Sequence, residues 1–120
     1  MSILLIDLDS GANLHGNRSS AETLLRLFMQ ELDAAISEIL HLHASKQLPE
    51  LYDKVHSLCG AACYSSTPRL LETLKKLNAT LAESAHNNES TIPETATTLV
   101  SQLEQDYLQT QALFRSEYQN

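Results

Sequence analysis

The stretch SSAETLLRLFMQELDAAISEILHL, residues 19–42, decides the fold class of this chain. Ser19 and Glu22 stand three residues apart, the spacing of a capping box, which predicts that a helix begins with Ser19 as its N-cap. Apolar residues then recur at intervals of three and four, the period of an amphipathic helix. The apolar stripe is broad, which predicts a helix packed against two neighbours rather than one. Its members are Leu24, Leu25, Phe28, Leu32, Ala35, Ile36, Ile39 and Leu42.

The same helical pattern continues on both sides of this stretch. Asp7 predicts the start of a short first helix that closes near Gly16, a residue free to adopt the left-handed conformation. Pro49 suits the first turn of a helix over about residues 48–64. Thr67 and Pro68 predict the N-cap and the first residue of the next helix.

A longer polar connection precedes the last helix. Ser84–Pro93 has no apolar period, which predicts a flexible loop over about residues 84–93, and the stripe resumes over about residues 94–117. We therefore expect an all-α fold, an antiparallel four-helix bundle with a short additional N-terminal helix. One domain is expected over residues 1–120, with a core of about 5–118.

Composition excludes several classes of protein. The chain has 120 residues, of which 42% are hydrophobic and three are glycine. Neither of the glycine-rich patterns that bind nucleotide phosphates, G-x-x-x-x-G-K-[ST] and G-x-G-x-x-G, occurs in the chain. An enzyme driven by a nucleotide is therefore not expected. Fifteen acidic residues against eight lysines and arginines give a net charge of −7. This is the wrong sign for a protein that binds the phosphate backbone, so no nucleic-acid partner is expected.

Secretion and membrane insertion are not expected either. The apolar run Ile3–Ile6 is short, is followed at once by Asp7 and lacks the basic start of a signal peptide. No stretch approaches the roughly 20 apolar residues that span a bilayer, so we expect no direct membrane contact by this domain. Cys59 and Cys63 lie four apart on one predicted helix, a poor geometry for a disulfide. Reduced thiols predict a cytoplasmic setting.

One segment carries the strongest indication of function. His56, Leu58 and Gly60 lie at alternate positions of the predicted third helix. A glycine inside a helix costs about 1 kcal/mol relative to alanine, so Gly60 is expected to have a compensating role. Gly60 lies one turn beyond His56 on the same face, where a missing side chain clears room for a large partner to reach the imidazole.

The segment HSLCGAACYSSTPRL, residues 56–70, resembles the histidine-containing phosphotransfer (HPt) domain. The H-x-L-x-G core recurs in that family. The Tyr-Ser-x-x-Pro-Arg-Leu continuation resembles the C-terminal HPt domain of tripartite hybrid sensor kinases of the Bar/Gac/Let type. With the capped second helix, the resemblance covers roughly residues 5–115.

The resemblance implies that His56 is a phosphoacceptor. In this family the histidine accepts a phosphoryl group from an aspartyl phosphate on the receiver domain of a hybrid kinase and passes it to an aspartate of a response-regulator receiver domain. The partner receiver is expected to carry the Mg²⁺, and this domain no cofactor, no ATP site and no autokinase activity. A monomer is expected, either free-standing or as part of a hybrid sensor kinase anchored in the inner membrane.

The other expected site residues surround His56. If the hairpin turns near Ser66, the antiparallel register places Lys75, Asn78 or a near neighbour opposite His56, and a polar side chain there could orient the ring. Asn78 also matches a position where many family members carry glutamine or another polar residue. Cys59 stands where many members carry a lysine. The expected docking surface around the phosphoacceptor consists of Ser57, Cys59, Gly60, Ala61, Cys63, Tyr64 and Lys75, with Ala12 and His15 at its rim.

Two other functions remain open from the residues alone. His56, Cys59 and Cys63 share one helical face and could form part of a Zn²⁺ or Cu(I) site, although a fourth ligand is missing. Alternatively, the helices could form a non-catalytic adaptor in which His56 is incidental. Replacing His56 distinguishes the adaptor from the relay, because an adaptor would keep its signalling output.

Overall fold

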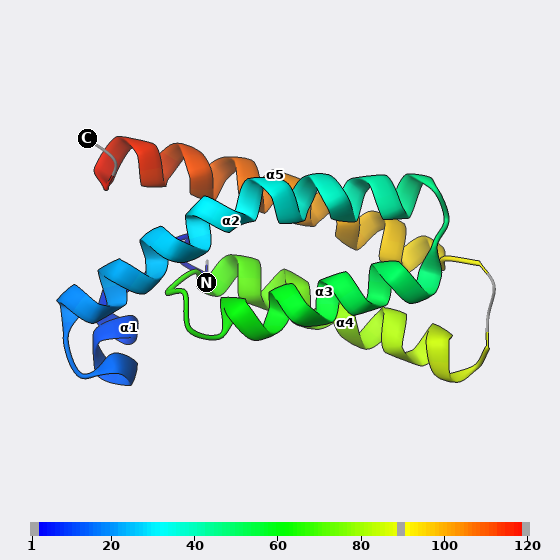
Figure 1. Ribbon diagram of the computed structural model, residues 1–120, viewed down its shortest axis with the longest axis horizontal. Coiled ribbons are helices and arrows are strands. Elements are labelled where there is room, and N and C mark those ends of the chain that lie inside the picture. Colours follow the sequence, from blue (N-terminus) through cyan, green and yellow to red (C-terminus); the bar gives the residue numbers. More distant parts are fainter. Residues whose placement is uncertain (1–2, 89–90, 119–120) are drawn as a thin grey trace.

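The protein is all-α in the computed structural model, which describes residues 3–88 and 91–118 (Figure 1). Within those ranges the backbone forms helices and turns, with no strand. The expected domain limits 1–120 include residues 1, 2, 119 and 120, which lie outside the described residues. The helices are α1 (Leu8–His15), α2 (Arg18–Ala44), α3 (Leu48–Ala62), α4 (Pro68–His86) and α5 (Glu94–Glu117).

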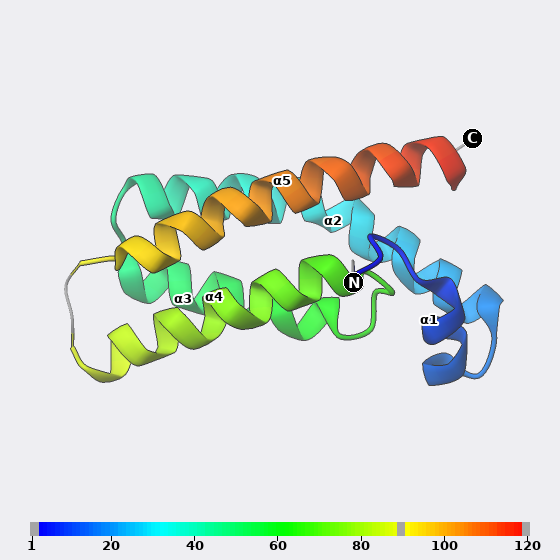
Figure 2. The same cartoon turned by 180° about the vertical axis from the view of Figure 1, so that it is seen from behind.

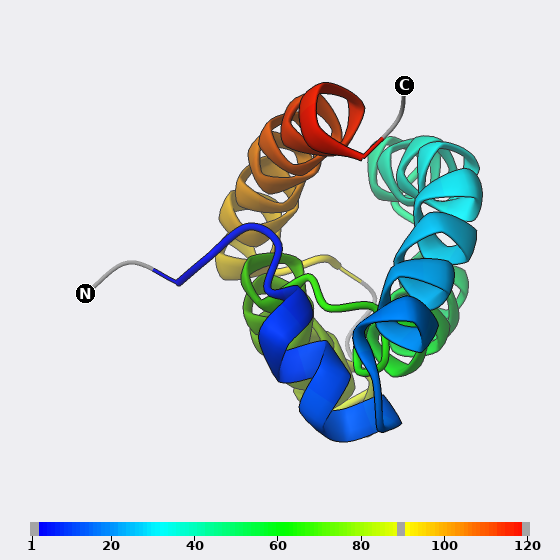
Figure 3. The same cartoon turned by 90° about the vertical axis from the view of Figure 1, so that its left-hand side faces the viewer.

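The four long helices contact one another in a closed order. Helix α2 packs against α3, α3 against α4, α4 against α5, and α5 against α2, while α1 packs against α2. Figures 1 and 2 show α3 and α4 side by side, and α1 beside the N-terminal part of α2. Seen end-on, the long helices surround a common interior (Figure 3). Leucine dominates the largest fully buried side chains there: Leu25, Leu32, Leu51, Leu70, Leu74, Leu77, Leu81 and Leu103.

Helix α1 has the ends that the sequence predicts. The Asp7 side chain caps it by accepting a hydrogen bond from the Ser10 backbone N–H at 3.1 Å. Gly16 ends the helix in the left-handed conformation, with φ of 88°. A glycine has no Cβ penalty there, so this residue type fits the tight connection into α2.

The start of α2 differs from the prediction. The N-cap is Asn17, not Ser19, because the Asn17 side chain accepts a hydrogen bond from the Ser20 N–H at 2.7 Å. Ser19 and Glu22 therefore lie inside the helix rather than in a capping box. Instead of reaching back to a cap, Glu22 pairs with Arg26 one turn ahead, at 2.8 Å. Asparagine caps helices as well as serine does, so the local pattern alone allowed either start.

Two helix ends also differ from the predicted limits. Helix α3 ends at Ala62, with Cys63 as its C-cap, so Tyr64 lies in the turn and not in the helix. Helix α4 continues through His86 because Ser84 faces the interior, 4% exposed, and packing overrides the polar sequence. The predicted loop over 84–93 is therefore too long at its start, and its residues 89–90 lie outside the described residues.

The N-terminal segment is fastened to the start of α4. The Asp7 N–H donates to the Ser66 carbonyl at 2.9 Å, and the Arg69 N–H donates to the Leu4 carbonyl at 3.2 Å. The Arg69 guanidinium adds two bonds to the Ile3 carbonyl, at 3.0 and 2.8 Å, and one to the Gln109 side chain at 2.9 Å. Arg69 thus joins the N-terminal segment, α4 and α5.

A buried carboxylate joins α4 to α5. Asp106 is 1% exposed and accepts hydrogen bonds from Thr73 at 2.5 Å and from Gln102 at 2.9 Å. The Thr110 hydroxyl donates to the Asp106 backbone carbonyl at 2.7 Å. A buried carboxyl group is tolerated only with such partners, so this network fixes how α5 lies along α4.

Ser66 is under strain, and we predict that Ser66→Gly stabilises the protein by about 1 kcal/mol. Its φ is 64°, which costs a residue with a Cβ, and its buried hydroxyl has no hydrogen-bond partner among the described residues. Glycine removes both penalties and leaves the carbonyl bond to Asp7. Urea unfolding checks this, and a lower midpoint for Ser66→Gly would contradict it.

Gly11→Ala gives the complementary measurement. A Cβ at Gly11 would lie 2.0 Å from the Ser66 Oγ, so alanine alone is expected to be destabilising. Most of that loss should disappear in Gly11→Ala/Ser66→Gly, because only the 3.0 Å approach to the Ala21 Cβ then remains. If Gly11→Ala lowers the free energy of unfolding equally in the wild-type and Ser66→Gly backgrounds, the predicted clash with Ser66 is wrong.

Candidate functional site

His56 lies exposed on the outer face of α3. The residues on either side of it in the helical pattern, Val55 and Leu58, are buried in the core at 0% and 7% exposure. These anchors fix the rotation of α3, so the imidazole points away from the interior by necessity. The result is an accessible histidine on a rigid element.

Asn78 on α4 is the polar partner of His56. The His56 Nδ1 lies 3.3 Å from the Asn78 Oδ1, so the predicted register opposite His56 is confirmed for this pair. A carbonyl oxygen only accepts hydrogen bonds, so this contact forms when Nδ1 carries the ring proton. The Nε2 atom then presents its lone pair to solvent. The arrangement orients the imidazole and leaves its Nε2 side facing away from Asn78.

Tyr52 is a neighbour of His56 that the sequence analysis missed. Its ring centroid lies 5.9 Å from that of the imidazole, with the planes tilted by 54°. Tyr52 is half-buried and precedes His56 by one helical turn. The spacing of four residues was the signal that could have identified it. Tyr52 and Asn78 together restrict the ring from two directions.

Gly60 leaves open space beside the imidazole. A Cβ built at Gly60 would meet no atom within 4 Å, apart from its own helix and chain neighbours. Close helix packing therefore does not explain this glycine, and its helix carries the usual cost of about 1 kcal/mol with no gain inside the fold.

The two cysteines on this face do not cluster with His56 in a way that could hold a metal ion. Burial raises the pKa of the Cys59 thiol, the nearby Cys63 raises it further, and Lys75 partly opposes the shift. The Cys59 thiol is therefore protonated at neutral pH. Within residues 3–88 and 91–118, no cluster of three or more His, Cys, Asp or Glu side chains could hold a metal ion.

The remaining expected residues fall on two further surfaces. Ser57 and Ala61 line a groove between α2 and α3, of about 420 Å³, which also includes Phe28 and Leu58. On α3 they lie on the side of His56 that faces α2, whereas Asn78 lies on the side that faces α4. This groove presents apolar surface next to the candidate phosphoacceptor, bordered by Lys54 and Glu31.

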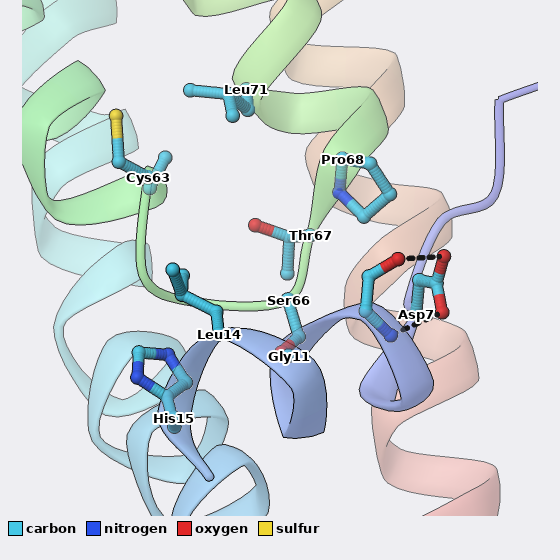
Figure 4. Close-up of a pocket in the computed structure, with 11 residues that line it drawn as sticks. Asp7, Gly11, Leu14, His15, Cys63, Ser66, Thr67, Pro68 and Leu71 are labelled. Carbon is cyan, nitrogen blue, oxygen red and sulfur yellow. Dashed lines mark hydrogen bonds between the residues drawn. The ribbon is translucent and has the colours of Figure 1, made fainter.

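Cys63 and Tyr64 lie at the end of α3 nearest to α1. Figure 4 shows a small cavity there, of about 150 Å³, between α1 and the turn that joins α3 to α4; Cys63, His15 and Leu14 are among the residues that line it. The His15 Nε2 lies 3.1 Å from the Tyr64 carbonyl oxygen, and the two rings are 6.2 Å apart. Tyr64 is 58% exposed and Leu14 59%, so this end of the face is apolar and open.

Comparisons of the chain with protein-family models, with curated proteins and with solved structures found no match. Across the residues that the structure describes, no helix is both long enough and apolar enough to cross a bilayer.

The open space at Gly60 leads to a stability prediction. Gly60→Ala is expected to stabilise the protein by up to about 1 kcal/mol, because alanine favours the helix and its methyl group meets nothing. Thermal and urea unfolding of the two proteins measure the difference. A loss of stability would mean that Gly60 has a packing role inside the fold.

Proposed function

We propose that this chain is a histidine phosphotransfer domain of a two-component phosphorelay, with His56 as the phosphoacceptor. We further propose that α2–α5 form the antiparallel four-helix bundle of such domains, with α1 as the additional N-terminal helix. The carrying observation is the exposed imidazole whose Nδ1 lies 3.3 Å from the Asn78 Oδ1. The open surface at Gly60 supports the same proposal, since a Cβ there would meet no atom within 4 Å and a partner could approach His56 over it.

The chemistry required of this chain is small. The Nε2 lone pair of His56 attacks the phosphorus of a receiver's aspartyl phosphate in line with the leaving oxygen. The new P–N bond forms as the P–O bond breaks, and the aspartate leaves with the electron pair as a carboxylate. The ring proton stays on Nδ1 in its bond to Asn78, which supports the positive charge that develops on the ring. The second transfer reverses these steps onto another receiver aspartate.

The partners of this reaction would be receiver domains. The receiver carries the Mg²⁺ that neutralises its acidic site, and this chain contributes no cofactor. The groove lined by Ser57 and Ala61 and the open end at Tyr64 flank His56 with apolar surface that a partner helix could cover. The relay would operate as a cytoplasmic monomer, alone or within a hybrid sensor kinase anchored in the inner membrane.

The first experiment follows phosphate on the purified chain. With a phosphorylated receiver domain and Mg²⁺, the wild type is expected to acquire acid-labile, alkali-stable phosphate, as phosphohistidine does. His56→Gln should acquire none, because no other nucleophile occupies that position. Radiolabel transfer followed by acid and alkali treatment measures both outcomes.

The control variant is His86→Gln, which removes an exposed histidine at the C-terminal end of α4 and should keep the label. Circular dichroism checks that each variant is folded. If several receivers fail to label the folded wild type, the relay proposal is wrong. If His56→Gln also keeps its signalling output and receiver binding, the adaptor function is the better account.

A larger side chain at Gly60 should block the receiver but not the fold. Gly60→Gln is expected to lower the rate of transfer from a receiver by at least about tenfold, because its side chain fills the space beside His56. Phosphorylation of His56 by the small donor phosphoramidate should change much less. Comparable losses with both donors would mean that the substitution disturbs His56 itself.

A further inference from the structure

Phosphorylation places an anion on an already acidic molecule. The chain has a net charge of −7, and a phosphoryl group on His56 adds up to about two negative charges. On α3 itself, exposed Asp53 lies one turn before His56. Cys59 and Gly60, which carry no charge, lie one turn after it. Lys54, also on α3, is paired with Glu38 on α2, so a further lysine for this group would come from a neighbouring helix.

The pairing of α3 with α4 identifies which lysine can supply it. The two helices run in opposite directions on either side of the turn, and His56 meets Asn78. Moving one turn toward that connection on both helices leads from His56 to Cys59 and from Asn78 to Lys75, a step of about 5 Å along each axis. Lys75 therefore lies across from Cys59, and its charge acts on the Cys59 thiol.

Lys75 is also available for a new contact. It is exposed, and among residues 3–88 and 91–118 no carboxylate lies within ion-pair distance of its ammonium group. The other nearby lysines are already engaged. Lys54 pairs with Glu38 on α2 at 3.1 Å, and Lys76 pairs with Glu72 at 3.6 Å.

Cys59 lies between Lys75 and the imidazole, since it is one turn beyond His56 on the side of α3 that faces α4. Its side chain is short and uncharged, so a flexible lysine stem can pass it toward His56. Lys76, in contrast, lines the hollow between α4 and α5 with Glu94 and Leu99, away from α3.

We propose that Lys75 is the residue that neutralises the phosphoryl group carried on His56, reaching from α4 past the short Cys59 side chain. This role rests on the proposed phosphotransfer function. Lys75 forms a charge-assisted hydrogen bond to a phosphoryl oxygen as charge develops during transfer. Lys75 takes no part in breaking the P–O bond or in forming the P–N bond. It keeps its proton throughout.

The test uses phosphoramidate as a donor that needs no docking surface. Lys75→Met is expected to phosphorylate His56 about fivefold more slowly than the wild type, the loss expected for one exposed ionic contact. Lys75→Arg should stay close to the wild type because it keeps the charge. The difference between wild type and Lys75→Met should shrink in high salt, which screens exposed charges.

Lys76→Met is the matched control, since it removes the same charge from the adjacent residue on another face. Cys59→Lys in the Lys75→Met background is the rescue, because a lysine there returns the charge to the facing position on α3. Recovery of most of the rate would support an electrostatic role, and a merely structural effect of Lys75 would not respond to it. Unfolding midpoints should be unchanged in all exposed-lysine variants.

The outcomes separate the two proposals. If the wild type is labelled and Lys75→Met reacts at the same rate, or only as slowly as Lys76→Met, the role of Lys75 is wrong and the relay stands. If Lys75→Met is slower only with a receiver as donor, Lys75 serves docking, which also overturns the neutralising role. If neither phosphoramidate nor receivers label wild-type His56, the relay and the role of Lys75 fail together.

Discussion

The antiparallel contact between α3 and α4 is the constraint on which the candidate site depends. One short turn, residues 63–67, joins the helices, so the register of one against the other is set by how that turn is held. Ser65 and Thr67 are buried in it and share a side-chain hydrogen bond. Because the turn is fixed, Asn78 meets His56 and Lys75 lies across from Cys59.

Helix α1 and the N-terminal segment hold that turn from outside. The Asp7 N–H bonds to the Ser66 carbonyl, and Gly11 lets α1 approach the Ser66 side chain more closely than any residue with a Cβ could. Arg69 then joins the N-terminal segment to α4 and α5. The strained conformation of Ser66 persists because these contacts over-determine it. Helix α1 thus helps to hold the turn that sets the register of α3 against α4.

The face around His56 presents the few features that the proposed relay would require of it. Its imidazole is positioned by Asn78 and Tyr52, and the surface beyond it is kept low by Gly60. Burial holds the Cys59 thiol protonated, which removes a competing nucleophile from the same face. A reactive nitrogen, an orienting amide and free access are what in-line phosphoryl transfer needs from one of its two partners.

The sequence by itself determined the helical class, most helix limits, the place of His56 beside the core face, and that Lys75, Asn78 or a near neighbour lies opposite it; the structure shows that Asn78 makes the contact. These follow from local periodicity and from a hairpin register that a short turn leaves little freedom to change. Only the tertiary structure decided that Asn17 caps α2, that α4 continues to His86, that Tyr52 flanks the imidazole and that Asp106 is buried between helices. It also decided that Gly60 has no packing role. Such features depend on which neighbour covers each side chain, and contacts between residues distant along the chain leave no periodic signal in it.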